Sequence, residues 1–291
     1  MKADFKTIAL VGKYNNSPAS SGVLTRLAEF LQKRGHSVLL SAHTADTCSI
    51  QDFRVSTLNE IGRVADLAIV LGGDGTLLHV ARTLVDHQVP MIGINQGRLG
   101  FLADVSIDTM FSTLQEMLDG KYTAEDRVMI ESSVERSDDI LIAAYAFNDV
   151  VVSKSTMGRL IEFEVYIDNQ FVYSQRADGL VVASPTGSTA YAMSAGGPIL
   201  HPTLEAFVMV PICPHTLSAR PIAVNSHAEI EINLIHAMDA RVHFDGQRHA
   251  DLQVGDRVIV RRGKNPVRLL HPEGHNYYDT LRQKLHWGEK L

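Results

Sequence analysis

Strand-like and helix-like segments alternate through roughly the first 120 residues, and this alternation limits the possible folds more than any other feature. The apolar runs that predict buried strands are residues 6–12, 38–40, 67–71 and 91–94. Between them, apolar residues recur at helical spacing, as they do in residues 20–33. Strands joined by helices require right-handed crossovers, so we expect a mostly parallel sheet with helices on both faces.

The pattern changes in the second part of the chain. Residues 160–168 and 229–234 alternate apolar and polar side chains with a period of two, which is typical of half-buried strands. Long helical stripes are absent until residues 278–287. We therefore predict an α/β domain, a mainly β domain and a helical tail, at residues 1–124, 125–275 and 276–291.

Charge and cysteine content exclude several classes of protein. The formal net charge is −6, with 27 Lys and Arg against 33 Asp and Glu, so the chain has no general attraction for nucleic acid or an anionic membrane. The two cysteines, Cys48 and Cys213, flank no metal motif and suit a reducing compartment. The N-terminal residues lack the apolar stretch of a signal peptide, and no apolar run is long enough to cross a bilayer. We expect a cytoplasmic protein.

Two histidines near the C-terminus have a spacing that can hold a metal ion on a helix. His271 and His275 are four residues apart, but Pro272 and Gly274 lie between them and favour a turn. We therefore predict that the protein has no metal site of its own at these histidines.

A glycine-rich loop follows the strand at residues 67–71 and opens a helix. In an open parallel sheet, ligands collect at the carboxyl ends of strands, where helix N-termini attract phosphate. Gly73 and Gly75 would let the backbone approach an anion closely. Asp74 would repel phosphates unless it bound Mg²⁺ or accepted a proton from an attacking hydroxyl. The alternative is an ordinary turn in which Asp74 caps the helix.

The glycine-rich loop does not match the common nucleotide-binding signatures. The sequence contains no G-x-x-x-x-G-K-[ST], which excludes a P-loop enzyme. It also contains no G-x-G-x-x-G, because Leu78 stands where the third glycine would be. A conventional dinucleotide-dependent dehydrogenase is therefore disfavoured.

Three further segments carry residues suited to a nucleotide. Residues 95–102 follow the fourth strand, and Phe101 could lie beside a base or ribose, although an ordinary loop with Phe101 in the core is the alternative. Residues 176–198 are rich in hydroxyls and glycines, and Asp178 could accept from a ligand amide, although a tight corner of the β domain would look similar. Asn148-Asp149 could bind ribose hydroxyls or form a solvated turn.

Taken in order, these segments give the chain a family resemblance over nearly its whole length. It resembles the NAD kinases of Gram-negative bacteria. The GGDGT motif at residues 72–76 also occurs in diacylglycerol and sphingosine kinases, so it is the less specific match. The more specific matches are NQGRLGFL at 95–102, Asn148-Asp149, RADGLVVASPTGSTAY at 176–191, SAGGPIL at 194–200, HTLSARPI at 215–222 and Asp245-Gly246-Gln247.

The resemblance implies a fold and an activity. The family combines an α/β domain, built on a Rossmann-like parallel sheet, with a β-sandwich. Its members transfer the γ-phosphoryl group of ATP to the 2′-hydroxyl of the adenosine ribose of NAD, which gives NADP. They require a divalent cation, Mg²⁺ or Mn²⁺, and assemble as homodimers or homotetramers.

The resemblance also implies roles for single residues. Asp74 would accept the proton of the 2′-hydroxyl, with Gly75 near the dinucleotide. Asn148 and Asp149 would hold the adenosine part, with Asp149 standing where most members have Glu, and Asp178 would meet the nicotinamide end. The other implied binding positions are Gly73, Phe101, Arg159, Arg176, Thr186, Thr189, Ala190, Tyr191, Ser194 and Gln247. In having arginine rather than glycine at position 176, the chain resembles family members that prefer NAD over NADH.

Two rival functions are weighed against this one. A lipid kinase would share the GGDGT loop, but it needs an apolar slot for acyl chains, whereas residues 176–200 are small and hydroxylated. A non-catalytic sensor of NAD or NADPH would gain nothing from the Asp74 carboxylate beside phosphates. Both comparisons favour an NAD kinase.

Overall fold

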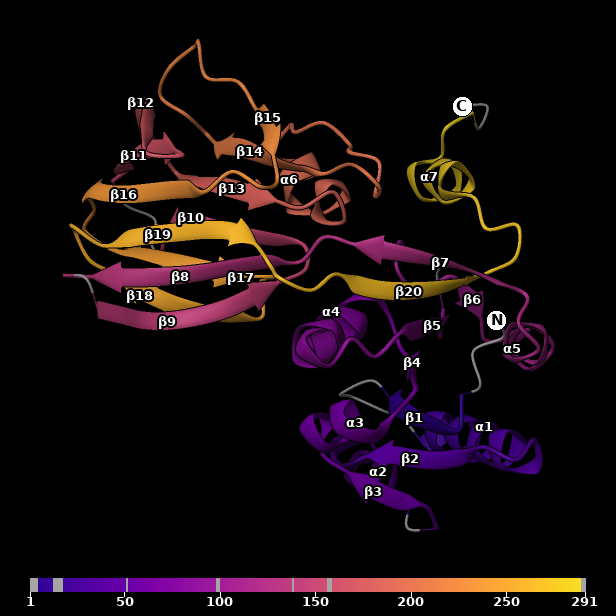
Figure 1. The fold of residues 1–291 in the computed structure, drawn as a ribbon. Helices are drawn as coiled ribbons and strands as arrows, with labels where there is room; N and C mark the ends of the chain where they lie inside the picture. Colours follow the sequence, from indigo (N-terminus) through magenta and orange to yellow (C-terminus); the bar gives the residue numbers. More distant parts are fainter. Residues whose placement is uncertain are drawn as a thin grey trace. The chain divides into compact units, whose positions relative to one another are not determined.

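The computed structural model describes residues 5–12, 18–50, 52–97, 100–137, 139–155 and 159–288, without the side chains of residues 18–20. The chain divides into two compact units (Figure 1). The first comprises Met1–Asp126 together with Val267–Leu291, and the second comprises Arg127–Pro266. This is an α/β unit followed by a mainly β unit, as the sequence predicts.

An eight-stranded sheet forms the centre of the first unit, in the order β3-β2-β1-β4-β5-β20-β7, with β6 paired to β5. The pairs β2–β3, β1–β2, β1–β4, β4–β5, β5–β6 and β5–β20 are parallel. The strands are β1 (Thr7–Gly12), β2 (Ser37–Ser41), β3 (Arg54–Ser56), β4 (Leu67–Leu71), β5 (Met91–Asn95), β6 (Val105–Ser106), β7 (Tyr122–Arg127) and β20 (Val267–Pro272). The predicted parallel sheet is confirmed.

Helices cover both faces of this sheet because its strands are apolar on both sides. Ile8 and Leu10 of β1 pack in one core with Leu27 of α1 and Leu114 of α5. Ala9, between them, is equally buried and faces the other way. The helices are α1 (Pro18–Lys33), α2 (Ala42–Cys48), α3 (Leu58–Val64), α4 (Asp74–Leu84), the short 3₁₀ helix η1 (Val85–His87), α5 (Met110–Leu118) and α7 (Tyr277–Leu285). Among the described residues, no helix is both long and apolar enough to span a bilayer.

The second unit is a sandwich of two six-stranded sheets, in the orders β15-β14-β13-β10-β17-β18 and β12-β11-β16-β19-β8-β9. Its strands are β8 (Ile130–Arg136), β9 (Asp139–Ala146), β10 (Asp149–Lys154), β11 (Ile161–Ile167), β12 (Gln170–Ala177), β13 (Gly179–Ala183), β14 (Ala206–Ile212), β15 (Ile222–Asn225), β16 (Ile230–His236), β17 (Ala240–Phe244), β18 (Arg248–Leu252) and β19 (Arg257–Arg262). Two short helices, η2 (Gly187–Thr189) and α6 (Tyr191–Ser194), follow β13.

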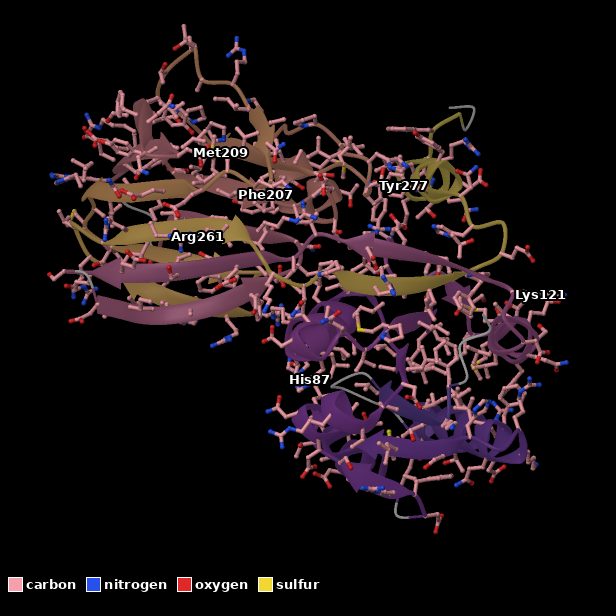
Figure 2. All side chains as sticks on the ribbon, viewed as in Figure 1. His87, Lys121, Phe207, Met209, Arg261 and Tyr277 are labelled. Carbon is pink, nitrogen blue, oxygen red and sulfur yellow. The ribbon has the colours of Figure 1, made fainter. Side chains whose placement is uncertain are left out.

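One apolar core joins the two sheets of the sandwich. Phe207 and Met209 of β14 (Figure 2) contribute to it from one sheet, and Phe163 and Val165 of β11 contribute from the other. The period-two pattern of residues 160–168 therefore has the predicted cause, because one face of β11 is buried in this core.

The boundary between the units differs from the predicted one at the C-terminal side. Residues 267–275 were expected in the β domain, but β20 inserts between β5 and β7 of the first sheet. Its Val267, Leu269 and Leu270 are buried there. The sequence could not reveal this return, because β20 follows β19 after only a short turn and looks locally like one more strand of the sandwich. The predicted C-terminal helix is present as α7, with Asn276 accepting from the Tyr278 amide as its N-cap.

This topology predicts that the second unit can fold from one continuous segment of the chain, whereas the first unit needs both of its segments. A fragment spanning residues 127–266 should unfold cooperatively by itself, because it holds both sheets of its core. A fragment spanning residues 1–126 should not, because it lacks β20, which pairs between β5 and the edge strand β7. Thermal melts by circular dichroism would check both. A cooperative melt of residues 1–126 equal to that of a fusion carrying residues 267–291 would contradict the expectation.

Candidate active site

Asp74 is the first residue of α4, directly after the turn that ends β4. The N-cap position is Gly73, and no side chain caps the helix. The carboxylate of Asp74 instead accepts three backbone N–H groups, from Phe101 at 2.9 Å, Leu102 at 3.0 Å and Ala103 at 3.3 Å. The helix-cap interpretation of Asp74 is therefore wrong, because its side chain serves a neighbouring loop.

Two glycines make this arrangement sterically possible. A Cβ atom on Gly100 would lie 2.1 Å from Oδ1 of Asp74. A Cβ atom on Gly93 of β5 would lie 2.7 Å from the Cα of Ala103. Since both distances are far below van der Waals contact, the carboxylate and the loop at residues 100–103 can approach only because these positions lack side chains.

The three amides fix the orientation of the Asp74 carboxylate and leave part of it available. An ionised carboxylate offers about four lone-pair positions. Oδ1 accepts from Leu102 and Ala103, whereas Oδ2 accepts only from Phe101 among the described residues. Oδ2 therefore has a lone pair left for a donor outside the protein, such as a ligand hydroxyl.

Space lies open beside the start of α4. A Cβ atom on Gly73 would meet nothing within 4 Å, and the backbone φ of −100° suits any residue. Neither packing nor conformation of the protein therefore demands glycine at this position. A residue without a side chain at a helix N-terminus is what close approach of an anion requires.

A cavity of about 250 Å³ opens at the carboxyl ends of β1 and β2. Its walls are largely apolar and come from Val11, Gly12, Ser41, Ala42, His43, Thr57, Leu58 and His79. Burial, followed by the positive charge of Arg82, lowers the pKa of His79, so this imidazole is neutral near pH 7. The cavity has the size and lining of a subsite for an uncharged heterocycle.

In the second unit, Asp245 organises the residues around the Asn148-Asp149 pair. Asp245 and Gly246 have positive φ angles of 52° and 63°, and they form the turn that joins β17 to β18. The Asp245 carboxylate accepts the backbone N–H groups of Phe147 at 3.0 Å, Asn148 at 2.7 Å and Asp149 at 3.2 Å. The start of β10 is held in this way, as the loop at residues 100–103 is held by Asp74.

The segment after β13 packs directly onto the same place. Ser184 donates its backbone N–H to the Asn148 carbonyl at 2.8 Å and its hydroxyl to the Phe147 carbonyl at 2.6 Å. A Cβ atom on Gly187 would lie 2.1 Å from the Asn148 carbonyl oxygen, so this position also needs glycine. These contacts bring residues 184–191 against the Asn148-Asp149 pair.

A cavity of about 390 Å³ lies where these segments meet. Four of the predicted binding residues line it, namely Asn148, Asp149, Ala190 and Tyr191. The other lining residues are Val151, Ser153, His243, Asp245 and Gly246. Burial, followed by the neighbouring Cys213, Asp178 and Asp149 groups, raises the pKa of Tyr191, which places Asp178 in the same electrostatic environment.

Asp149 is the most perturbed carboxyl group in this cavity. Its side chain is buried at the start of β10, and burial together with the charge of Asp245 raises its pKa to about 7. The group therefore exists both protonated and ionised near neutral pH. It can donate to or accept from a ligand hydroxyl, depending on pH.

Comparisons with known proteins agree with this geometry. The profile of the ATP-NAD kinase N-terminal domain matches residues 9–122, and that of the ATP-NAD kinase C-terminal domain matches residues 147–272. The chain belongs to the ATP-NAD kinase family. The NAD kinases of Thiobacillus denitrificans and Chromobacterium violaceum are 56% and 52% identical to it over 291 residues, which is 100% of each chain.

Solved structures of this family have the same fold. The NAD kinase from Archaeoglobus fulgidus in complex with ATP has a TM-score of 0.76 at 25% identity, covering 97% of this chain and 100% of that one. Yeast NADH kinase in complex with NADH has a TM-score of 0.91 at 23% identity, covering 100% of this chain and 90% of that one. The α/β unit followed by a β-sandwich is therefore the architecture of the family.

The structure brings together only part of the remaining predicted binding residues. Asp178 forms an ion pair with Lys154 at the end of β10, at 2.5 Å. Thr186 and Thr189 are buried beside the cavity, and the Thr186 hydroxyl accepts from the buried Arg127 at 3.5 Å. These threonines support the wall of the site rather than expose their hydroxyls to it.

Four predicted residues lie on the surface and outside the lining of the cavity. Arg176 is 64% exposed, with its Nε 3.7 Å from Glu162. Arg159, Ser194 and Gln247 are also exposed. In the loop at residues 95–102, Phe101 is half-buried under the Lys284 ammonium, so it is not a core residue, whereas Arg98 and Leu99 lie outside the described residues.

Sequence reasoning missed some residues of the site. His243 lies on β17, whose alternating pattern places it among half-exposed positions, and Lys154 is the last residue of β10. Nothing in the sequence distinguishes either residue. Asp245 differs from these two, because the sequence marks it as part of the Asp245-Gly246-Gln247 match, and an Asp-Gly turn between two strands places a carboxylate at the sheet edge. Its contacts with β10 span nearly a hundred residues and have no local signature.

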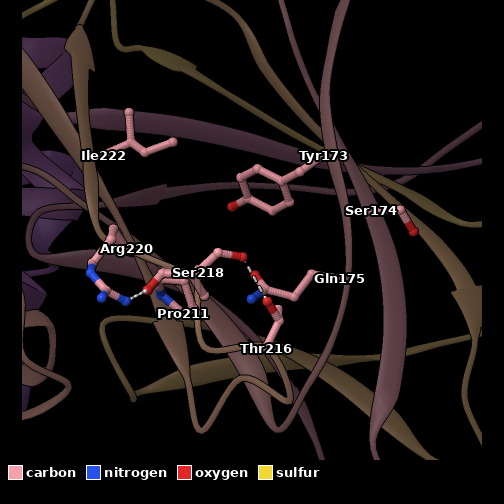
Figure 3. Close-up of a pocket in the computed structure, with 9 residues that line it drawn as sticks. Tyr173, Ser174, Gln175, Pro211, Thr216, Ser218, Arg220 and Ile222 are labelled. Carbon is pink, nitrogen blue, oxygen red and sulfur yellow. Dashed lines mark hydrogen bonds between the residues drawn. The ribbon is translucent and has the colours of Figure 1, made fainter.

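Another cavity, of about 270 Å³, lies elsewhere on the sandwich (Figure 3). It collects the HTLSARPI motif, where the hydroxyls of Thr216 and Ser218 are 2.9 Å apart and Arg220 donates to the carbonyls of Leu217 and Ala219. None of the predicted binding residues lines it. We therefore assign the candidate site to the cavity at Asn148 and Asp149.

The raised pKa of Asp149 makes the stability of the protein depend on pH. The folded state keeps this proton up to about pH 7, whereas an unfolded Asp releases it near pH 3.9, so stability falls as the pH rises between these values. Asp149→Asn should therefore raise the free energy of unfolding most at pH 8, by at most about 4 kcal/mol, and little near pH 4. Urea unfolding at both pH values checks this.

The matched control is Asp251→Asn, which alters an exposed carboxylate of the same sheet that pairs with Arg241. Its effect on stability should be small at both pH values. An equal effect of Asp149→Asn at pH 4 and pH 8 would count against the buried, proton-holding carboxyl group.

Proposed function

We propose that this protein is an NAD kinase that transfers the γ-phosphoryl group of ATP to the adenosine 2′-hydroxyl of NAD. The observation that carries the proposal is the Asp74 carboxylate, held by three backbone amides beside open space at a helix N-terminus. A carboxylate in such a place serves a proton transfer better than it serves simple phosphate binding. The relatives with more than half of their residues identical bear the same name.

We assign the dinucleotide to the cavity at Asn148 and Asp149. The Asn148 carboxamide and the Asp149 carboxyl group offer donors and acceptors in its lining, and Tyr191 offers an exposed ring for stacking. Asp178, charged and paired with Lys154, suits the amide of the nicotinamide end. A polar lining of this kind favours a dinucleotide over the acyl chains of a lipid substrate.

We assign the phosphates of ATP to the start of α4, at Gly73. The apolar cavity between β1, β2 and α4 is the candidate subsite for the adenine ring, because a neutral, largely apolar wall suits a neutral heterocycle. The divalent cation, Mg²⁺ or Mn²⁺, enters as part of the substrate, bound to the triphosphate, and neutralises its charge.

The reaction then needs one proton acceptor. The 2′-oxygen of the adenosine ribose attacks the γ-phosphorus in line, a new P–O bond forms, and the bond to the bridging oxygen of ADP breaks. The hydroxyl proton passes to Oδ2 of Asp74, which keeps a lone pair beside its bond from Phe101. The amides of residues 101–103 hold the carboxylate in the orientation that this transfer requires.

We also propose a cytoplasmic location and assembly into a homodimer or homotetramer. Cys48 and Cys213 are not joined in a disulfide, which suits a reducing compartment. Large apolar side chains of the sandwich unit are exposed, among them Leu217 and Phe171. We take these side chains as candidates for a surface that another subunit covers.

Asp74→Asn tests the proposed base. The amide oxygen can still accept from Leu102 and Ala103, so the fold and NAD binding should persist while only the bond from Phe101 is lost. Loss of the proton acceptor should lower kcat by about 10²–10⁴-fold. Formation of NADP from NAD, ATP and Mg²⁺ measures kcat, and calorimetric titration measures NAD binding. Turnover close to that of the wild type would refute the assignment of Asp74.

Gly73→Ala tests the proposed phosphate site. The added methyl group meets nothing within 4 Å among the described residues, so stability should not change. It would occupy the space of the phosphates, and losing a charge-assisted contact should raise KM for ATP about tenfold while KM for NAD stays the same. Gly22→Ala, equally free of contacts in α1, is the matched control. An unchanged KM for ATP would remove the phosphates from this place.

A further inference from the structure

Two histidines and one aspartate form a buried cluster next to the loop at residues 101–103, whose amides bind the Asp74 carboxylate. Nδ1 of His271 lies 2.8 Å from Oδ2 of Asp104, and Nδ1 of His275 lies 2.9 Å from the same oxygen. The side chains of Asp104 and His271 are buried, and that of His275 is 16% exposed. Glu125 adds a second carboxylate, with Oε2 at 3.2 Å from Nε2 of His271.

The electrostatics of the cluster favour an ionised Asp104. Burial by itself would raise the pKa of this carboxyl group, but the hydrogen bonds and charges of His271 and His275 outweigh it and lower the pKa to about 2. Both histidines can donate an Nδ1–H to the carboxylate, whichever charge they carry. The cluster is therefore a pair of charge-assisted hydrogen bonds onto one buried oxygen.

The ring geometry favours hydrogen bonds over metal coordination. The imidazole rings of His271 and His275 are stacked, with centroids 4.2 Å apart and planes 13° apart. A metal ion must lie near the plane of each ligating ring, at about 2.0–2.1 Å from its nitrogen. One ion cannot satisfy both conditions for two stacked rings, whereas a hydrogen bond tolerates the out-of-plane approach.

The cluster is connected to Asp74 through a very short stretch of chain. Asp104 follows Ala103, the last of the three residues whose amides bind the Asp74 carboxylate. His271 is the next-to-last residue of β20, and His275 lies in the turn before α7. Lys284 of α7 adds a contact at the other end of the loop, with its Nζ 5.6 Å from the Phe101 ring centroid.

We propose that His271 and His275 are positioning residues, which fix Asp104 and thereby hold the amides of residues 101–103 against the Asp74 carboxylate. The proposal rests on the function proposed above for Asp74. It gives the returning C-terminal segment a task in phosphoryl transfer, because β20 and the turn after it supply both histidines. Neither histidine touches a substrate; each acts through the loop.

The test combines activity with hydrogen exchange in the full-length protein. In the His271→Ala/His275→Ala variant, the amides of residues 101–103 should lose protection from exchange, and kcat should fall about ten- to a hundredfold because the base is displaced. KM for NAD and for ATP should change by less than about twofold. Asparagine places an amide N–H where Nδ1 stood, so His271→Asn/His275→Asn should restore both protection and kcat.

The matched control is Asp126→Asn, which breaks the exposed ion pair between β7 and Arg268 of β20. It should leave kcat and the protection of residues 101–103 unchanged. The protection of β2 from exchange should stay the same in every variant. Unchanged protection of residues 101–103 in the alanine variant would overturn the proposal. Lost protection with an unchanged kcat would show that the histidines hold the loop, and it would overturn their role in catalysis. Asp74→Asn tests the role of Asp74 separately.

Discussion

A carboxylate bound by successive backbone amides is the interaction on which the candidate site depends in each unit. Asp74 holds residues 101–103 in the first unit, and Asp245 holds residues 147–149 in the second. In both cases a side chain from the end of one strand orders the chain next to another strand. Such charge-assisted bonds are stronger than bonds between neutral groups, and they lie where loops would otherwise have few constraints.

Close approach of chain segments is the second requirement, and glycine meets it. Gly93 and Gly100 make room for the loop and the carboxylate in the first unit, and Gly187 does so beside Asn148 in the second. Gly73 differs from these three, because the protein leaves the space beside it open. The glycines of the two sites are therefore required for different reasons. Three of them allow close packing, and the fourth gives a ligand access to the backbone.

Much of this could be predicted from the sequence, and the reasons for success and failure are physical. The parallel sheet and the period-two strand at residues 160–168 follow from local patterns, and the structure confirms them. The family resemblance predicted Asn148, Asp149, Ala190 and Tyr191 as binding residues, and these four residues line one cavity. The contacts that organise the site, from Asp74 to residue 101 and from Asp245 to residue 147, join distant residues and leave no local pattern. The return of β20 was missed for the same reason.

That return has a consequence for how the protein is made. β20 lies between β5 and β7, although the ribosome synthesises the whole sandwich between β7 and β20. The nascent first unit must wait with an open sheet edge, exposed to aggregation, until residues 267–272 emerge from the exit tunnel. Chaperone dependence during translation should accordingly concentrate on the first unit, and the two histidines that contact Asp104 arrive only when synthesis is almost complete.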